Sequence, residues 1–209
     1  LKIERNNVVK EKFEVLMITG GCGFIGSTFI RFWSRNHRQC KIINLDKLTY
    51  AGNINNLKDI NDNVNYQFVR GDIGDFIFVD KIVKKFKPDC IVNFAAETHV
   101  DRSLADSNIF MQTNVVGTNN LLEAALKHEV KRFHQISTLN LIEGDSKEYV
   151  GDSVNPYATS KVASDYLVRL FYQSFGLPVT ITKCSNNYGP YQFPEKMISL
   201  AITNLIEGK

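Results

Sequence analysis

The 209-residue sequence lacks several features that mark particular classes of protein. It has no apolar run of membrane-spanning length and no secretory signal at its start, so we expect no membrane partner and a cytoplasmic location. The formal net charge of +3 is too small to indicate nucleic-acid binding, although anionic nucleotides remain compatible ligands. Internal repeats and low-complexity segments are also lacking. The 44% of hydrophobic residues is enough for a sizeable core.

Cysteine is scarce and dispersed. Cys22, Cys40, Cys90 and Cys184 show no metal-type spacing, and they lie in or beside apolar runs. Zinc sites need closely spaced thiols, and disulfide frameworks need an oxidising compartment. We therefore predict reduced core cysteines, with neither a disulfide nor a metal site.

A glycine-rich turn near the start of the chain is its most informative stretch. Residues 15–19 predict a short buried strand, residues 27–35 predict a helix, and Gly20, Gly23 and Gly26 lie between them. A strand that turns sharply into a helix can bring backbone N–H groups close to a pyrophosphate, where side chains would block the approach. The pattern indicates a dinucleotide-binding turn.

An acidic residue lies at the distance that such a turn requires. Asp46 follows an apolar strand at 41–45 and lies twenty residues beyond Gly26. Its carboxylate can accept from both hydroxyls of an adenosine ribose, which favours NAD over NADP. Lys47, directly after it, leaves the 2′-phosphate of NADP as the alternative.

Strands and helices alternate along the rest of the chain. This order predicts an α/β fold, a doubly wound parallel sheet of Rossmann type. We expect a flexible lead-in at 1–12, an NAD-binding domain at 13–184 and the start of a truncated substrate-binding region at 185–209. The chain begins with Leu1 and stops at Lys209 without a visible closing element, which we interpret as a fragment. The predicted strands are 15–19, 41–45, 65–69, 89–94, 132–137 and 178–183, and the predicted helices are 27–35, 76–85, 103–127 and 155–175.

Two of these helices, 103–127 and 155–175, are long and apolar on more than one face. One sheet needs fewer apolar positions, so the surplus predicts a homodimer through these two helices. Absent C-terminal residues could cover the same surface instead. The residues concerned are Leu121, Leu122, Ala125 and Leu126 in the first helix, and Ala163, Tyr166, Leu167, Leu170 and Phe171 in the second.

A tyrosine and a lysine stand four residues apart at the start of the last helix. Tyr157 and Lys161 therefore project from one helical face, one turn apart. A phenol has a pKa of about 10 and is a poor base at neutral pH, but a nearby ammonium and a cationic nicotinamide ring favour the phenolate. Ser137 and Thr138 end the preceding strand, where ligands of such sheets bind. We interpret the group as a catalytic site.

Together these motifs resemble the extended short-chain dehydrogenase/reductase superfamily. Four further segments, 46–53, 94–103, 113–118 and 184–196, closely resemble the dTDP-glucose 4,6-dehydratases. The resemblance covers nearly the whole chain after the first dozen residues. It implies NAD-dependent dehydration of a nucleotide-activated hexose, dTDP-glucose to its 4-keto-6-deoxy product, by oxidation, elimination of water and return of the hydride.

The resemblance also implies a role for individual residues. Tyr157 is the base for the sugar hydroxyl, Lys161 orients the nicotinamide ribose, and Thr138 faces the sugar. Taken alone, several have simpler interpretations: Asp72 could cap a turn, and Asn186 and Asn187 could satisfy loop backbone. The implied cofactor contacts are Gly20, Gly23, Phe24, Ile25, Gly26, Asp46, Lys47, Leu48, Thr49, Asp72, Ile73, Ala95, Ala96, Glu97, Thr98, His99, Thr113, Tyr157, Lys161 and Asn187, and the implied substrate contacts are Thr98, Thr138, Asn186, Glu195 and Lys196.

One departure from the family pattern affects the chemistry. Family members continue Ser-Thr with Asp-Glu, the acid and the base of the elimination, whereas Thr138 is followed here by Leu139 and Asn140. Neither side chain exchanges protons at neutral pH. Three interpretations follow: an inactive nucleotide-binding relative, a nucleotide-sugar 4-epimerase that uses Tyr157 alone, or a short segment missing between Thr138 and Leu139. The last also explains why the stretch up to Tyr157 is shorter than in the family.

Overall fold

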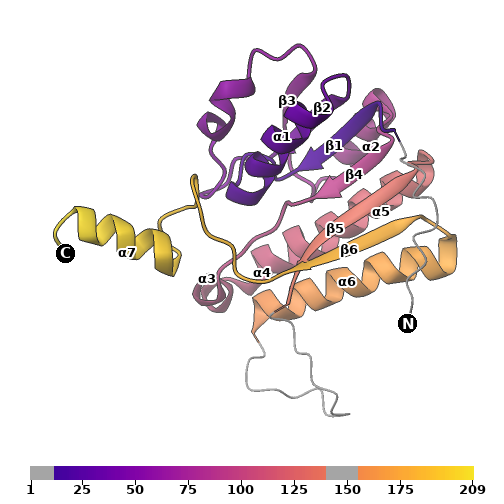
Figure 1. Cartoon of the computed structure of the whole chain (residues 1–209). Coiled ribbons are helices and arrows are strands. Elements are labelled where there is room, and N and C mark those ends of the chain that lie inside the picture. The colour runs from indigo at the N-terminus through magenta and orange to yellow at the C-terminus, as the bar shows by residue number, and fades with distance from the viewer. Residues whose placement is uncertain (1–11, 140–154) are drawn as a thin grey trace, which may run out of the picture.

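A single parallel sheet of six strands forms the centre of the molecule (Figure 1). The fold is described from a computed structural model over residues 12–139 and 155–209. The strand order β3-β2-β1-β4-β5-β6 reverses direction between β1 and β4, as in a doubly wound fold, so the predicted fold class is confirmed. The strands are β1 (Val15–Thr19), β2 (Lys41–Asp46), β3 (Tyr66–Arg70), β4 (Cys90–Asn93), β5 (Arg132–Thr138) and β6 (Val179–Cys184).

Helices cover the sheet on both faces and create two separate cores. One core packs α2, α5 and α6 against the sheet, and the other packs α1 against its opposite face. Both are built on the central strands β1, β2 and β4, which are buried in nearly every position, as a sheet covered on two sides requires. The helices are α1 (Phe24–Asn36), α2 (Phe76–Phe86), α3 (Val100–Ala105), α4 (Ser107–Phe110), α5 (Thr118–Lys127), α6 (Pro156–Phe175) and α7 (Met197–Ile206), with a 3-10 helix η1 (Ile54–Ile60) and a π-helix η2 (Met111–Gly117).

The predicted strands agree with the observed ones to within one or two residues at each end, and one extension matters for function. β2 continues through Asp46, so this carboxylate lies on the sheet itself rather than after it. The first helix also begins earlier than predicted, at Phe24 instead of residue 27. The glycine turn is therefore short, and Gly26 lies inside the first turn of the helix, close to the end of β1.

The predicted continuous helix at 103–127 is wrong. Asp106 adopts an extended conformation, and its side chain accepts hydrogen bonds from the backbone N–H groups of Asn108 and Ile109. An aspartate in this arrangement caps a new helix, so α3 ends and α4 begins. A π-helical stretch then joins α4 to α5. Apolar periodicity alone does not reveal such a break.

Two helices escaped prediction. η1 follows Asn53, whose side chain caps it through Asn55, and α7 closes the described chain. None of the residues of α7 is buried, and Figure 1 shows this helix standing away from the sheet. A sheet contact therefore does not account for the apolar composition of α7.

The apolar surplus on the two long helices is smaller than predicted. Leu121, Leu122 and Ala125 are fully buried between α5 and its neighbours, so they belong to the core. The outward apolar residues lie on α6, where Tyr166 and Leu170 are half exposed. α5 is covered because α2 and α6 flank it on both sides.

The four cysteines all lie in the described residues, and one of them departs from the predicted core position. All four cysteines are free; Cys22, Cys40 and Cys90 are buried, whereas Cys184 is only partly covered. No helix in the described ranges is both long and apolar enough to cross a membrane.

Candidate active site

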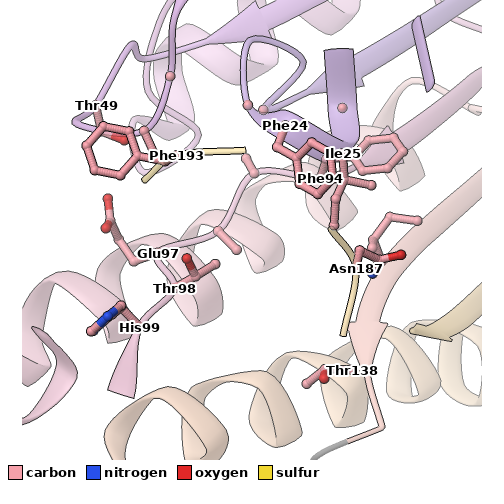
Figure 2. Close-up of a pocket in the computed structure, with 18 of the residues that line it drawn as sticks. Phe24, Ile25, Thr49, Phe94, Glu97, Thr98, His99, Thr138, Asn187 and Phe193 are labelled. Carbon is pink, nitrogen blue, oxygen red and sulfur yellow. The ribbon is translucent and has the colours of Figure 1, made fainter. Parts of the chain in front are cut away.

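A cleft of about 660 Å³ opens at the carboxyl edge of the sheet. Residues that follow β1, β2, β3, β4, β5 and β6 all contribute to its walls, as expected where the strand order reverses. Figure 2 shows Glu97, Thr98 and His99 on the side of Thr49 and Phe193, and Thr138 beside Asn187 on the other side.

The glycine turn forms one wall of this cleft, and three backbones meet there. Gly20 adopts a left-handed conformation with φ of +68°, and a Cβ at this position would collide with the backbone of Ala95. A Cβ on Gly26 would collide with the carbonyl oxygen of Gly20. Since backbone atoms cannot move aside, glycine is required at both positions. Gly20, Gly23 and Gly26 line the cleft together with the first helical residues, so the N-terminus of α1 borders it.

Asp46 connects this turn to the second strand. Its Oδ2 accepts from the backbone N–H of Cys22 at 2.8 Å, and its Oδ1 accepts from that of Leu48 at 2.8 Å. The carboxylate is 8% exposed and lines the cleft, and burial raises its pKa. Each oxygen retains a second lone pair, so the group can still accept from hydroxyls of a ligand.

Leu48 was predicted as a cofactor contact, but its side chain lies elsewhere. It packs against the core beneath α1 and does not line the cleft. Its backbone adopts φ of +59°, which turns the chain sharply after β2 and directs its N–H to Asp46. Leu48 therefore shapes the site through its backbone.

Lys47 and Asp72 form an ion pair of 2.6 Å at the mouth of the cleft. Asp72 also accepts a hydrogen bond from the backbone N–H of Gly74 and so caps a turn. The same residue lines the cleft. The turn-capping interpretation is therefore confirmed, and the contact of Asp72 with a cofactor stays a prediction. The ammonium of Lys47 is engaged by a carboxylate on the neighbouring loop.

A buried asparagine holds the backbone of Glu97 in the segment after β4. Asn114 on η2 accepts from the N–H of Glu97 at 2.8 Å and donates to its carbonyl at 3.0 Å and to Ser160 at 2.9 Å. Burial raises the pKa of the Glu97 carboxyl. His99 adopts φ of +99°, and its buried Nδ1 has no hydrogen-bond partner in the described structure. His99 thus combines a sparsely populated backbone conformation with a buried polar atom, and its contact with a cofactor stays a prediction.

Tyr157 and Lys161 both line the cleft, as their spacing predicts. Lys161 is 5% exposed, and its Nζ donates to the carbonyl of Ile136 at 2.7 Å. Burial lowers the pKa of Lys161 to about 8. Burial also raises the pKa of Tyr157, so the expected preference for phenolate is not established by the protein alone. The ammonium lies one turn deeper and is directed at β5.

A buried carboxylate lies one further turn along α6. Asp165 is 6% exposed, accepts from the hydroxyl of Ser137 at 2.8 Å and offers an Oδ1 that has no partner among the described residues. Its charge raises the pKa of Lys161 and partly opposes the effect of burial. Tyr157, Lys161 and Asp165 therefore form one row on the helix face that meets β5.

The remaining predicted residues also reach the cleft. Asn186, Asn187, Glu195 and Lys196 line it from the segment after β6. The side chain of Asn187 donates to the carbonyl of Ser185, so it also satisfies loop backbone. Leu48 is thus the one predicted site residue that the cleft lining omits. Glu143 and Asp145, the nearest carboxyls in sequence after Thr138, lie outside the described residues.

Several lining residues were not predicted as contacts. Most are apolar or small residues at strand ends, where sheet topology alone would have placed them. They include Phe94, Ile136, Cys184, Tyr188 and Phe193. In the described residues, no group of three or more histidine, cysteine or acidic side chains could hold a metal ion.

The geometry can now be compared with known proteins. Residues 17–209 match the model of a protein family described as GDP-mannose 4,6 dehydratase. The chain belongs to this family.

Several proteins named dTDP-glucose 4,6-dehydratase are similar to this chain in sequence. The chain is 45% identical over 213 residues to a dTDP-glucose 4,6-dehydratase of Neisseria meningitidis serogroup B, covering 93% of this chain and 59% of that protein. It spans about 60% of the length of such curated relatives. The alignment has 213 positions, although it uses only 93% of the 209 residues of this chain. Some positions of the relative therefore have no counterpart in this chain. The resemblance inferred from the motifs is confirmed.

Two solved structures illustrate the likeness in fold. A double mutant of DesIV, a dTDP-glucose 4,6-dehydratase from Streptomyces venezuelae crystallised with NAD bound, is 43% identical with a TM-score of 0.82, covering 92% of this chain and 62% of that one. A UDP-glucose 4-epimerase from Thermotoga maritima, solved with UDP-glucose, is 26% identical with a TM-score of 0.82, covering 93% and 64%. One fold therefore serves both chemistries.

Replacing Lys161 by methionine is expected to remove one component of the pH dependence of stability. The pKa of Lys161 is about 8 in the folded protein and 10.5 for an ordinary lysine, so between these values the unfolded chain binds more protons. Raising the pH through this window therefore stabilises the wild-type fold, by on the order of 2–3 kcal/mol. Urea unfolding of both proteins from about pH 7.5 to about pH 10.5 measures this difference. If the free energies of unfolding of the two proteins change in parallel with pH, the ammonium of Lys161 does not titrate in this pH range.

Proposed function

We propose that the protein catalyses the NAD-dependent dehydration of a nucleotide-activated hexose, dTDP-glucose to its 4-keto-6-deoxy product. The observation that supports this most strongly is the meeting of Tyr157, Lys161 and Thr138 with the glycine turn in one cleft. The sequence identity of 43–46% to proteins named dTDP-glucose 4,6-dehydratase narrows the reaction class. The proposal covers the residues 13–184 as cofactor domain and 185–209 as the beginning of the substrate region.

NAD fits the residues of the cleft. Gly20, Gly23 and Gly26 carry no side chains where they line the cleft, which lets a pyrophosphate approach the backbone at the start of α1. Asp46 offers buried carboxylate oxygens for the ribose hydroxyls, and Asp72 and Ile73 lie beside them in the lining. When bound, NAD would supply the acceptor of a hydride from C4 of the hexose.

The described residues support the proton transfer of the oxidation step. Tyr157 would remove the proton of the C4 hydroxyl, and Thr138 would hold the same sugar from β5. Lys161, fixed by the carbonyl of Ile136, would bring a positive charge near the ribose and the phenol. Because burial raises the pKa of Tyr157, the phenolate would need the positive charges of the complete complex.

The elimination of water needs an acid and a base next to Thr138. Leu139 follows directly in the sequence, and its N–H donates to the carbonyl of Cys184, which continues the β5–β6 pairing. We propose that an active protein carries the acid and base on a segment between Thr138 and Leu139. The greater length of the aligned relative supports this proposal.

A nucleotide-sugar 4-epimerase is the second candidate. Epimerisation needs oxidation and re-reduction at C4, and therefore no acid–base pair for elimination. The residues of the printed sequence around Thr138 favour it, as does the fold shared with a UDP-glucose 4-epimerase. An inactive nucleotide-binding relative is the third outcome.

We further propose that the protein forms a homodimer through α6. Tyr166, Leu170 and Phe175 are each about half exposed on this helix. A second copy of the same surface would bury them in a self-complementary contact. Sedimentation of the purified protein tests this, since a monomer at all concentrations would contradict it.

Replacing Tyr157 by phenylalanine is expected to abolish oxidation of dTDP-glucose while leaving NAD binding nearly unchanged. Only one hydroxyl is lost, but it is the group that removes the substrate proton. Absorbance of reduced nicotinamide and calorimetric titration with NAD measure the two quantities. Tyr172→Phe is the matched control, because Tyr172 is 60% exposed on α6. Substantial turnover in the Tyr157 variant would refute the assignment.

Replacing Asp46 by alanine is expected to weaken NAD binding by about 1–3 kcal/mol. The change removes the acceptor for the ribose and releases the backbone N–H groups of Cys22 and Leu48. Calorimetric titration with NAD gives the affinity, and Asp62→Ala on the exposed loop before β3 is the control. Equal affinities in the two variants would remove Asp46 from the cofactor site.

Product analysis separates the candidate functions. Incubation of the purified protein with NAD and dTDP-glucose is expected to give the 4-keto-6-deoxy sugar, identified by mass spectrometry. The same sample digested with trypsin should then lack the peptide 133–147 with the mass of the printed sequence and contain a heavier one. A C4 epimer would establish the second candidate, and unchanged sugar the third. A 4-keto-6-deoxy product from a protein with the unmodified peptide would overturn the proposed segment.

A further inference from the structure

A tyrosine outside the cleft lining connects two parts of the site that are distant in sequence. Tyr50 follows the loop residues Lys47 and Thr49, and its hydroxyl lies 3.0 Å from Oε1 of Glu195. The same hydroxyl lies 3.1 Å from the carbonyl oxygen of Thr98. The hydroxyl has one proton, which these two acceptors share or compete for, so this side chain lies where the loop after β2 meets the segments after β4 and β6.

The ring of Tyr50 is fixed on two sides. The guanidinium of Arg102 stacks on it at 3.6 Å from the ring centre, and Phe193 meets it edge to face at 5.4 Å. Burial raises the pKa of Tyr50 to about 12, so the phenol stays neutral and keeps its proton for donation. A hydrogen bond from a neutral hydroxyl to a carboxylate is among the stronger ones in proteins.

The segment that Tyr50 contacts has little other support. No residue from Ser185 to Lys209 is buried, although the described cleft depends on several of them. A further contact of this segment with the main body is the stacking of Arg31 on Tyr191 at 4.1 Å. Oε1 of Glu195 also lies 3.5 Å from the ammonium of Lys196, its neighbour in the same segment, so the hydroxyl of Tyr50 is the contact that ties this carboxylate to the loop after β2.

We propose that Tyr50 is a positioning residue that fixes the carboxylate of Glu195 at the cleft for hydroxyl groups of the nucleotide sugar. The identity of this ligand rests on the proposed function; the link between Tyr50 and the segment does not. With Oε1 anchored by the phenol, Oε2 can accept from a ligand hydroxyl without a loss of orientation. The cofactor loop and the substrate segment are then joined by one hydrogen bond.

Tyr50→Phe is the test, because it keeps the ring contacts with Arg102 and Phe193 and removes only the hydroxyl. Hydrogen–deuterium exchange of the peptide covering residues 189–200 is expected to become roughly tenfold faster, as loss of a charge-assisted hydrogen bond implies. The KM or Kd for dTDP-glucose should rise by a similar factor, while kcat and NAD affinity change less than about twofold. Tyr172→Phe is the matched control for both measurements.

Glu195→Gln gives a second variant that retains the shape of the acceptor. In a double-mutant cycle on exchange rates, Tyr50→Phe and Glu195→Gln should be less than additive, since both remove the same charge-assisted bond. Unchanged exchange in Tyr50→Phe would overturn the link, whatever the protein binds. Faster exchange with unaltered dTDP-glucose affinity would overturn the positioning role. If the wild type binds no dTDP-glucose, the proposed function fails, and the exchange measurement alone decides whether Tyr50 holds the segment.

Discussion

The close approach of three backbones at the glycine turn is the constraint on which the rest of the site depends. Gly20 touches the chain after β4, and Gly26 touches Gly20, so the first helix can begin directly at the end of β1. The Asp46 carboxylate then joins this turn to β2 through the backbone N–H of Cys22. Any side chain at these glycines would separate β1, β4 and α1, and the cleft would lose the wall that the glycine turn forms.

Buried side chains hold the loops around the glycine turn in place. Buried asparagines serve as connectors: Asn114 holds the backbone of Glu97, and Asn56 donates to the carbonyl of Cys22. Their amides each supply a donor and an acceptor, which lets one side chain satisfy backbone groups that no strand or helix pairs. The loops of the cleft are therefore positioned by the buried interior rather than by exposed contacts.

The end of the cleft that Tyr157 lines is organised differently. Tyr157, Lys161 and Asp165 follow one another on a single helix, and β5 supplies the carbonyl of Ile136 and the hydroxyl of Ser137 that meet them. A buried ammonium and a buried carboxylate on successive turns partly balance the cost of each other's burial. These contacts join α6 to β5, so under the proposed function the groups assigned to the oxidation step are held by these two elements.

Much of this could be read from local patterns. Apolar runs bounded by glycine or polar residues predicted all six strands. The spacing from Gly26 predicted that Asp46 lies beside the glycine turn. The break at Asp106 and the burial of Leu121 could not be read in this way, because a cap and a covered face depend on neighbours distant in the chain. The role of Leu48 was missed for a similar reason, since a positive φ leaves no mark on periodicity.

The sequence by itself determined the order of strands and helices, the need for glycine at the turn and the residue types available for chemistry. These follow from side-chain volume, periodicity and hydrogen-bonding capacity, which are properties of short stretches. Only the tertiary structure decided the environment of each group: that Lys161 is buried against β5, that Tyr157 is a weaker acid than in water, and that Tyr50 reaches Glu195. Solvent exclusion and contacts between residues as far apart as Tyr50 and Glu195 exist only once the chain has folded.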